Sequence, residues 1–118
     1  NNNFLFFLTN LDSKLYQTDF NIEGVSNYAF PLVLKKPNYT LRNKLEKMMK
    51  KNKIEFRRGN AGGGNQLRQP YIAQFVKNIN MKNFKNVEHI HNFGYYIGNY
   101  PSLKKQKIIK ICKSLNEI

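Results

Sequence analysis

The sequence predicts a small α+β domain, in which a largely antiparallel sheet of three to four strands carries helices on one face. Stretches with helical spacing of apolar residues alternate with short stretches rich in β-forming residues. One of the short stretches contains a proline, which confines it to a sheet edge or a bulge. Short strands of this kind fit an antiparallel sheet better than buried parallel βαβ units. A chain of 118 residues is long enough for one compact core, so we expect a single domain.

The first third of the chain is predicted to form a helix and then a strand. In residues 1–18, apolar side chains recur at spacings of three and four, which is typical of an amphipathic helix. These side chains are Phe4, Phe7, Leu8, Leu11 and Leu15. Residues 28–34 are rich in β-formers and include Pro31, so we expect an edge strand or a strand with a bulge. Residues 35–38 then form a turn.

A helix and a second strand are predicted next. Thr40 is a suitable N-cap for a helix over residues 41–51, whose lysines gather toward its C-terminal end. Residues 53–57 alternate polar and apolar side chains, as a strand does. This strand is followed directly by a glycine-rich segment, so it delivers Arg57 to one end of that loop.

The last part of the chain is predicted to contain a short helix, a strand and a final helix. Pro70 can start the short helix, whose expected buried side is Tyr71, Ile72, Phe75 and Val76. Residues 87–90 fit either a turn of helix or a short strand. Residues 93–98 indicate a strand, and residues 99–102 a turn and cap. The apolar face of the final helix is Leu103, Ile108, Ile109, Ile111, Cys112 and Leu115.

The most distinctive segment is the glycine loop of residues 57–70. Gly62, Gly63 and Gly64 allow positive φ and close approach of other groups, and arginines at both ends supply forked donors for carboxylate or phosphate. Neither a GxGxxG nor a GxxxxGK[ST] motif is present. The residues alone leave two alternatives of equal weight, an anion-binding loop and a surface loop whose arginines pair with acids.

Composition limits the other classes of function. The net charge of +13 invites a nucleic-acid interpretation, but the lysines are scattered and resemble solvated helix faces. A single cysteine, Cys112, is expected to be a buried apolar residue in a reducing cytoplasm. Together, Cys112, His89 and His91 provide too few ligands for a structural zinc site. We expect structural or partner-facing roles for the two histidines. We identify no paired catalytic carboxylates, no apolar run long enough for a membrane span and no secretory signal.

Several blocks together resemble the C-terminal domain of the DegT/StrS family, which comprises pyridoxal-phosphate-dependent sugar aminotransferases and keto-deoxysugar 3-dehydrases. The resemblance covers nearly the whole chain. Its blocks are Phe30–Leu34 (FPLVL), Lys53–Arg57 (KIEFR), Gly63–Pro70 (GGNQLRQP), Asn86–His91 (NVEHIH) and Gly94–Asn99 (GYYIGN) before a final helix. The stretch from Arg57 to Gly64 is longer than in many dehydrases, and Arg58 stands where a proline is common.

The resemblance implies the small C-terminal domain of a fold-type I aminotransferase. Residues 21–118 would form that domain, and residues 1–20 a linker helix toward a large domain. The family's cofactor site and its Schiff-base lysine, or the histidine that replaces it, belong to the large domain, so we expect this chain alone to be inactive and to bind no pyridoxal phosphate. The substrate-binding residues carried over are Arg57, Asn65, Arg68, His91 and Asn99.

The resemblance further implies a homodimeric, cytoplasmic enzyme that acts on a sugar in lipopolysaccharide or surface-glycan biosynthesis. Two alternatives from other classes remain at this point. One is a small basic nucleic-acid-binding module, which clustering of the basic residues on one face would favour. The other is a protein-interaction adaptor, which exposure of the apolar stripe of the first helix would favour.

Overall fold

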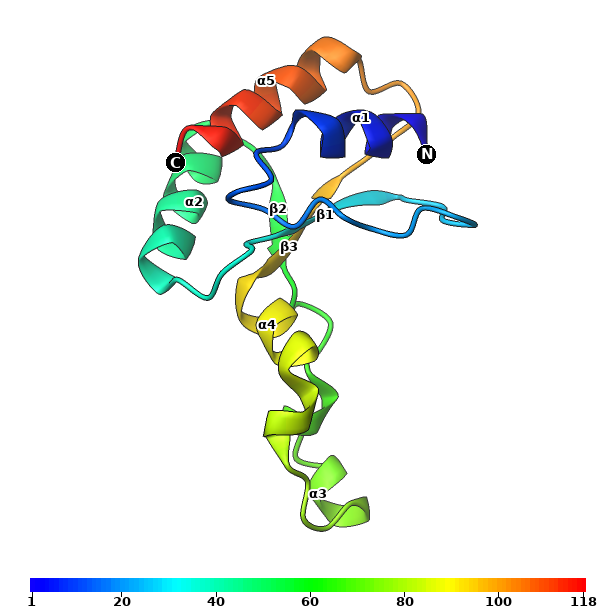
Figure 1. Ribbon diagram of the computed structural model, residues 1–118, viewed down its shortest axis with the longest axis vertical. Coiled ribbons are helices and arrows are strands. Elements are labelled where there is room, and N and C mark those ends of the chain that lie inside the picture. Colours follow the sequence, from blue (N-terminus) through cyan, green and yellow to red (C-terminus); the bar gives the residue numbers. More distant parts are fainter.

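The computed structural model describes residues 1–118, and it has the expected α+β architecture (Figure 1). The elements in chain order are α1 (Asn2–Asn10), β1 (Ala29–Val33), α2 (Tyr39–Lys51), β2 (Phe56–Arg58), α3 (Ile72–Phe75), α4 (Lys85–Phe93), β3 (Gly94–Gly98) and α5 (Lys105–Asn116). Two single-turn 3-10 helices, Gln66–Arg68 and Met81–Phe84, lie between β2 and α4.

The sheet has three antiparallel strands in the order β1-β3-β2. Because β3 is central, the proline-bearing β1 lies at an edge, as predicted. Pro31 faces Tyr96 across the β1–β3 pair. Proline has no backbone N–H to donate. At the edge of the sheet no further strand pairs with the outer side of β1, so Pro31 costs no hydrogen bond of the sheet there. The outer side of β1 is covered in part by a bridge between Tyr16 and Leu34.

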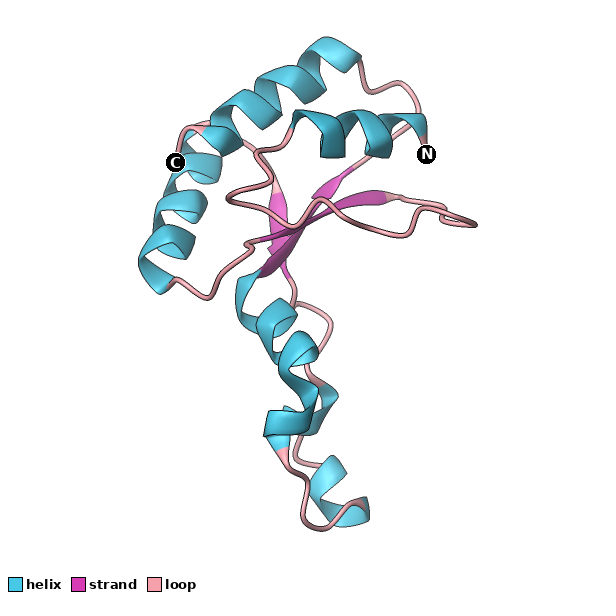
Figure 2. Ribbon diagram, viewed as in Figure 1, coloured by secondary structure: helices cyan, strands magenta, loops and turns pink.

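Helices α1, α2 and α5 cover one face of the sheet (Figure 2). Phe30 of β1 is fully buried there, and its ring stacks on that of Phe7 in α1 at 4.5 Å between centroids. Cys112 of α5 is buried with its thiol 3.7 Å from the Phe7 carbonyl oxygen, and burial raises the pKa of this thiol to about 12. Its interpretation as a buried apolar residue is therefore confirmed.

The N-terminal helix is shorter than predicted and ends at Asn10 instead of continuing to residue 18. The backbone N–H of Lys14 bonds to the Asp12 carboxylate at 2.8 Å, a turn that competes with helix continuation. Tyr16 then runs beside β1, and its hydroxyl donates to the Leu115 carbonyl oxygen. Because the apolar stripe of α1 is buried in the common core, it is not exposed as an adaptor surface would require.

Helix α2 begins two residues earlier than predicted, and its N-cap is Asn38 rather than Thr40. The Asn38 side chain accepts a hydrogen bond from the Leu41 N–H at 2.9 Å, so it satisfies a donor that the first helical turn leaves free. Helix α5 begins at Lys105 and has no side-chain cap, contrary to the cap predicted within residues 99–102.

The second strand begins three residues later than predicted because Lys53 and Ile54 close α2 instead. The Ile54 N–H bonds to the Met49 carbonyl at 2.8 Å and the Lys53 N–H to the Lys50 carbonyl at 3.1 Å. This is a Schellman-type helix end, which requires a left-handed residue, and Lys53 has φ 54°. The alternation of polar and apolar side chains alone cannot distinguish this helix end from the beginning of a strand.

We predict that Lys53→Gly stabilises the protein by about 1 kcal/mol, because glycine adopts the left-handed conformation without the Cβ penalty that lysine incurs. The thermal midpoint should rise by about 4 °C in a calorimetric scan. Lys47→Gly, an exposed change inside the same helix, is the matched control and should destabilise by about 1 kcal/mol. Equal effects of the two changes would contradict the assigned helix end.

Residues 60–92 form an arm that projects away from the sheet and the helix layer (Figure 1). It contains the glycine turn, α3 and most of α4, so residues 87–90 are helical. The predicted buried side of the short helix is wrong, because Tyr71, Phe75 and Val76 are exposed. Helix α3 has only four residues and lies at the tip of the arm, where no core is available to cover it.

Candidate functional site

The glycine turn folds back against α4. Gly63 and Gly64 have positive φ, at 104° and 63°. A Cβ atom added at Gly64 would lie 2.3 Å from Nδ1 of His91 and 2.9 Å from Cα of Asn60, whereas one at Gly62 would meet nothing within 4 Å. Glycine is therefore required at position 64 for conformation and for space. The close approach brings the loop and His91 together.

Asn65 holds this approach in place. Its backbone N–H donates to Nδ1 of His91 at 3.0 Å, and its side-chain amide donates to the Glu88 carboxylate at 2.8 Å. The side-chain oxygen Oδ1 of Asn65 accepts a hydrogen bond from the Leu67 N–H at 3.1 Å. Asn65 is only 1% exposed, so its side chain positions the loop. Because Nδ1 of His91 is an acceptor, the neutral ring carries its proton on Nε2, which is free to donate.

Arg68 and Glu88 form the charged part of the same cluster. The Nε of Arg68 lies 3.1 and 3.0 Å from the two carboxylate oxygens, and its Nη2 also bonds to Glu88. Asn92, one helical turn on, donates to Glu88 at 3.0 Å. The hydrogen bonds from Arg68, with those from Asn65 and Asn92, lower the pKa of Glu88 to about 2. We name Asn65, Arg68, Glu88, His91 and Asn92 the arm cluster.

The depressed pKa of Glu88 predicts a pH-dependent contribution to stability. Since the folded-state pKa is about 2 and the ordinary value is 4.5, the contribution is fully present above pH 4.5 and is lost as pH falls to about 2. Glu88→Gln should therefore lower the midpoint of urea unfolding near neutral pH, and the difference from the unmodified chain should vanish at about pH 2. Glu55→Gln, at an exposed carboxylate outside any ion pair, should change little at either pH. A pH-independent loss for Glu88→Gln would contradict this origin.

The structure brings together three of the five predicted substrate-binding residues, namely Asn65, Arg68 and His91. Arg57 lies elsewhere, exposed on β2 and beside a cavity next to α5. Asn99 follows β3 at the opposite end of that strand from α4. Its amide donates to the Asn27 carbonyl at 2.8 Å and its carbonyl accepts from Asn3 at 3.3 Å, so it ties loops together.

The remaining arginine of the loop, Arg58, is paired with a carboxylate of α2. It donates to Glu46 of α2 through Nε at 2.9 Å and Nη2 at 2.8 Å, and Tyr95 donates to the same carboxylate at 2.8 Å. Burial acts to raise the pKa of Glu46, but the hydrogen bonds from Arg58 and Tyr95 outweigh it and lower the pKa. This group fastens α2 to the sheet.

Glu88 and Glu46 are the acidic partners that sequence reasoning missed. Each is separated from its arginine along the chain, by 20 and 12 residues, so no local spacing reveals the pair. One local signal existed for Glu88. It lies three residues before His91, so both project from one side of a helix once residues 85–93 are assigned as helical.

An open hollow of about 740 Å³ lies beside the arm cluster. Arg68, Lys82 and Lys85 line it together with Glu88 and His89. His89 itself contacts the Leu34 carbonyl oxygen at 2.6 Å through Nε2, which is a structural role. The hollow thus offers cations and hydrogen-bonding groups to a polar ligand such as a sugar or a phosphate.

The fold and cluster define a small α+β domain whose loop and helix are joined into an arm by polar contacts. Neither a family model nor a curated protein matches the chain. Among solved structures, the crystal structure of GDP-4-keto-6-deoxymannose-3-dehydratase with a trapped PLP-glutamate geminal diamine is similar over 97% of this chain. The TM-score is 0.71 and the sequence identity is 22%. The expected fold is therefore confirmed, and the matched protein is of the kind that the sequence resemblance named.

The chain spans 29% of the length of that dehydratase. The likeness therefore concerns one part of a longer enzyme. None of the helices combines the length and the hydrophobicity that crossing a membrane would require.

Proposed function

We propose that the chain is the C-terminal substrate-recognition domain of a pyridoxal-phosphate-dependent sugar enzyme, either an aminotransferase or a nucleoside-diphosphate 4-keto-6-deoxyhexose 3-dehydrase. The observation that carries the proposal is the structural likeness to a 3-dehydratase along 97% of the chain. It agrees with the independent order of sequence blocks. Residues 21–118 form the small domain in this proposal, and residues 1–20 lead to a large domain.

The arm cluster is the proposed recognition element. Asn65 acts as a positioning residue, because both ends of its side-chain amide are occupied within the domain. Arg68 is half exposed and His91 keeps a free Nε2–H, so these two side chains are the ones available to a sugar hydroxyl, carboxylate or phosphate. We retain Arg57 as a contact of the whole enzyme because it is exposed and in no ion pair. Asn99 remains part of the proposal, although its side chain is already bonded to Asn27 and Asn3 within the domain.

The residues described do not fit pyridoxal phosphate itself. An imine-forming lysine is activated by desolvation in an apolar pocket or by a neighbouring cation. Every lysine of this chain is exposed, including Lys82 and Lys85 beside the hollow. Arg68, the cation of the arm cluster, is already paired with Glu88. In our proposal the cofactor and its chemistry therefore belong to the large domain, and this chain alone binds none.

The proposal extends to a cytoplasmic homodimer that modifies sugars for lipopolysaccharide or other surface glycans. We do not propose nucleic-acid binding as a second function. The exposed lysines are distributed over α2, the arm, α5 and the loops before β1 and α2, which is the pattern expected of a generally basic surface.

The proposal is tested on the native protein. Antibodies raised against the 118-residue chain should isolate, from its natural source, either a polypeptide about three times as long or a complex with a second chain. Acid release should yield pyridoxal phosphate, identified by mass spectrometry. A native species without this cofactor would refute the proposal.

The isolated chain provides the complementary test. After incubation with pyridoxal phosphate and borohydride, intact-mass analysis should show no stoichiometric lysine adduct. A single stoichiometric adduct would contradict the assignment of the cofactor to another domain. Scattered labelling of the exposed lysines would instead give a substoichiometric mixture of adducts.

A further inference from the structure

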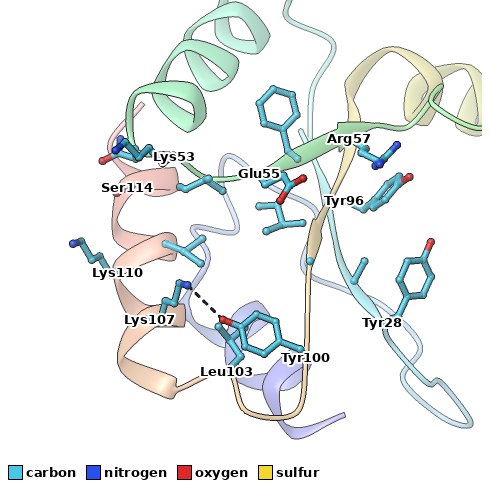
Figure 3. Close-up of a pocket in the computed structure, with 17 residues that line it drawn as sticks. Tyr28, Lys53, Glu55, Arg57, Tyr96, Tyr100, Leu103, Lys107, Lys110 and Ser114 are labelled. Carbon is cyan, nitrogen blue, oxygen red and sulfur yellow. Dashed lines mark hydrogen bonds between the residues drawn. The ribbon is translucent and has the colours of Figure 1, made fainter.

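A second cavity, of about 580 Å³, lies between β2, the end of β3 and α5 (Figure 3). It arises because β2 pairs with β3 only as far as Phe56, which faces Ile97, whereas β3 continues to Gly98. The preceding residues turn away to close α2, with the Ile54 N–H bonded to Met49. The wedge left open at the sheet edge is the α5 pocket. Its volume is typical of small-molecule sites.

The floor of the α5 pocket is apolar. Ile97 and Leu103 are buried, and Phe56 and Ile111 are partly buried against the core. Tyr28 and Tyr96 lie edge to face on one side, with ring centroids 6.4 Å apart. A flat hydrophobic group would find an apolar surface on this floor.

The rim of the pocket is cationic. Lys107 and Lys110 of α5 lie on one side and Arg57 on the other, and Lys53 closes the end toward α2 (Figure 3). The two ion pairs of the structure are Arg58–Glu46 and Arg68–Glu88, so none of the rim cations is neutralised by a carboxylate. Glu55 is the one acid that lines the pocket.

We propose that the α5 pocket binds an amphipathic organic anion, with a flat apolar group on the floor and a phosphate among the rim cations. Charge complementarity argues for the anion, since four cations and only one carboxylate line the pocket. Tyr100 accepts a hydrogen bond from Lys107 at 3.4 Å, which holds this ammonium at the mouth. The proposal does not rest on the function proposed above.

The probe is 1-naphthyl phosphate, titrated against the 118-residue chain by calorimetry and by amide NMR shifts. For a ligand of this size we expect a Kd of about 0.1–1 mM. The amides that shift should surround Ile97, Tyr100 and Ser114. Inorganic phosphate and 1-naphthol should each bind at least about tenfold more weakly, because phosphate lacks the apolar group and 1-naphthol lacks the anion. Equal binding of 1-naphthol would overturn the role of the cations.

A charge-matched pair of variants separates the pocket from the general basicity of the protein. Changing Lys53, Lys107 and Lys110 to Gln should weaken binding about tenfold. The control changes Lys51, Lys104 and Lys113 to Gln, which removes the same charge from residues that do not line the pocket. It should leave Kd within about twofold. Equal weakening by both sets would overturn the proposal.

A pocket-filling variant tests the floor without removing charge. Ser114 of α5 lines the pocket and is half-buried, so Ser114→Phe places a ring inside it (Figure 3). Its ring should fill the pocket and weaken binding at least about tenfold, with an unchanged thermal midpoint. Full affinity in this variant, or shifts confined to the arm, would contradict the assignment of the α5 pocket.

Discussion

Phe30→Ala should lower the free energy of unfolding by about 4 kcal/mol, the largest effect that we expect of any single substitution described for this protein. Phe30 is fully buried in the central part of the core. It stacks on Phe7 at 4.5 Å with an interplanar angle of 7°, and on Phe4 at 6.4 Å. Removing the ring leaves a cavity between the sheet and α1 that neither neighbour can fill without moving the helix.

This loss is a large part of the 5–15 kcal/mol that typically stabilises a domain, and the thermal midpoint should fall by about 15 °C. Denaturant unfolding followed by circular dichroism measures the effect. The matched control is Phe75→Ala, because Phe75 is 78% exposed at the tip of the arm. It should change the unfolding free energy by at most about 0.5 kcal/mol. Similar losses at both positions would show that Phe30 does not lie in a closed core.

Gly64→Ala should have the second largest effect, which we expect to be local to the arm. The change places a Cβ atom on a residue with φ 63°, at a cost of about 1–2 kcal/mol. It also forces that atom to 2.3 Å from His91 and 2.9 Å from the Asn60 backbone. The loop has to move away from α4, which breaks the hydrogen bond from the Asn65 N–H to His91.

Amide hydrogen exchange is the appropriate measurement, because it reports local opening separately from global unfolding. Exchange at Asn65 should accelerate at least about thirtyfold, since 2 kcal/mol or more of local stability is lost. Gly62→Ala is the control, as its Cβ atom has open space and its φ is not positive. It should leave exchange at Asn65 within about threefold. Faster exchange in both variants would mean that loop flexibility, rather than the contact with His91, is what was altered.

Local patterns predicted the elements well where one physical effect dominated. Pro31 alone indicates an edge strand, because a residue without an N–H is unsuited to a central position, and β1 lies at the edge. The apolar face of the final helix was also predictable. Its buried members are Ile108, Cys112 and Leu115, with Leu103 just before the helix. Ile109, which was also predicted on this face, is exposed, so the buried side of the helix is narrower than the apolar spacing predicts.

Predictions failed where two local solutions compete. Residues 53–57 alternate as a strand does, yet Lys53 and Ile54 satisfy helix carbonyls of α2. Residues 11–18 continue the helical spacing, yet the Asp12 turn and the bridge at Tyr16 end the helix. Tyr71 and Phe75 have helical apolar spacing, but that spacing does not reveal that the arm extends beyond the core.

The sequence by itself determined the α+β class, the edge strand, the glycine loop as the distinctive segment and the resemblance that the fold likeness supports. These features depend on residue types and on short spacings. Only the tertiary structure decided which charges are paired. Arg68 meets Glu88 and Arg58 meets Glu46, while Arg57 stays unpaired beside the α5 pocket. The reason is physical: a carboxylate and a guanidinium interact strongly only within a few ångströms, and folding brings together partners that sequence distance keeps apart.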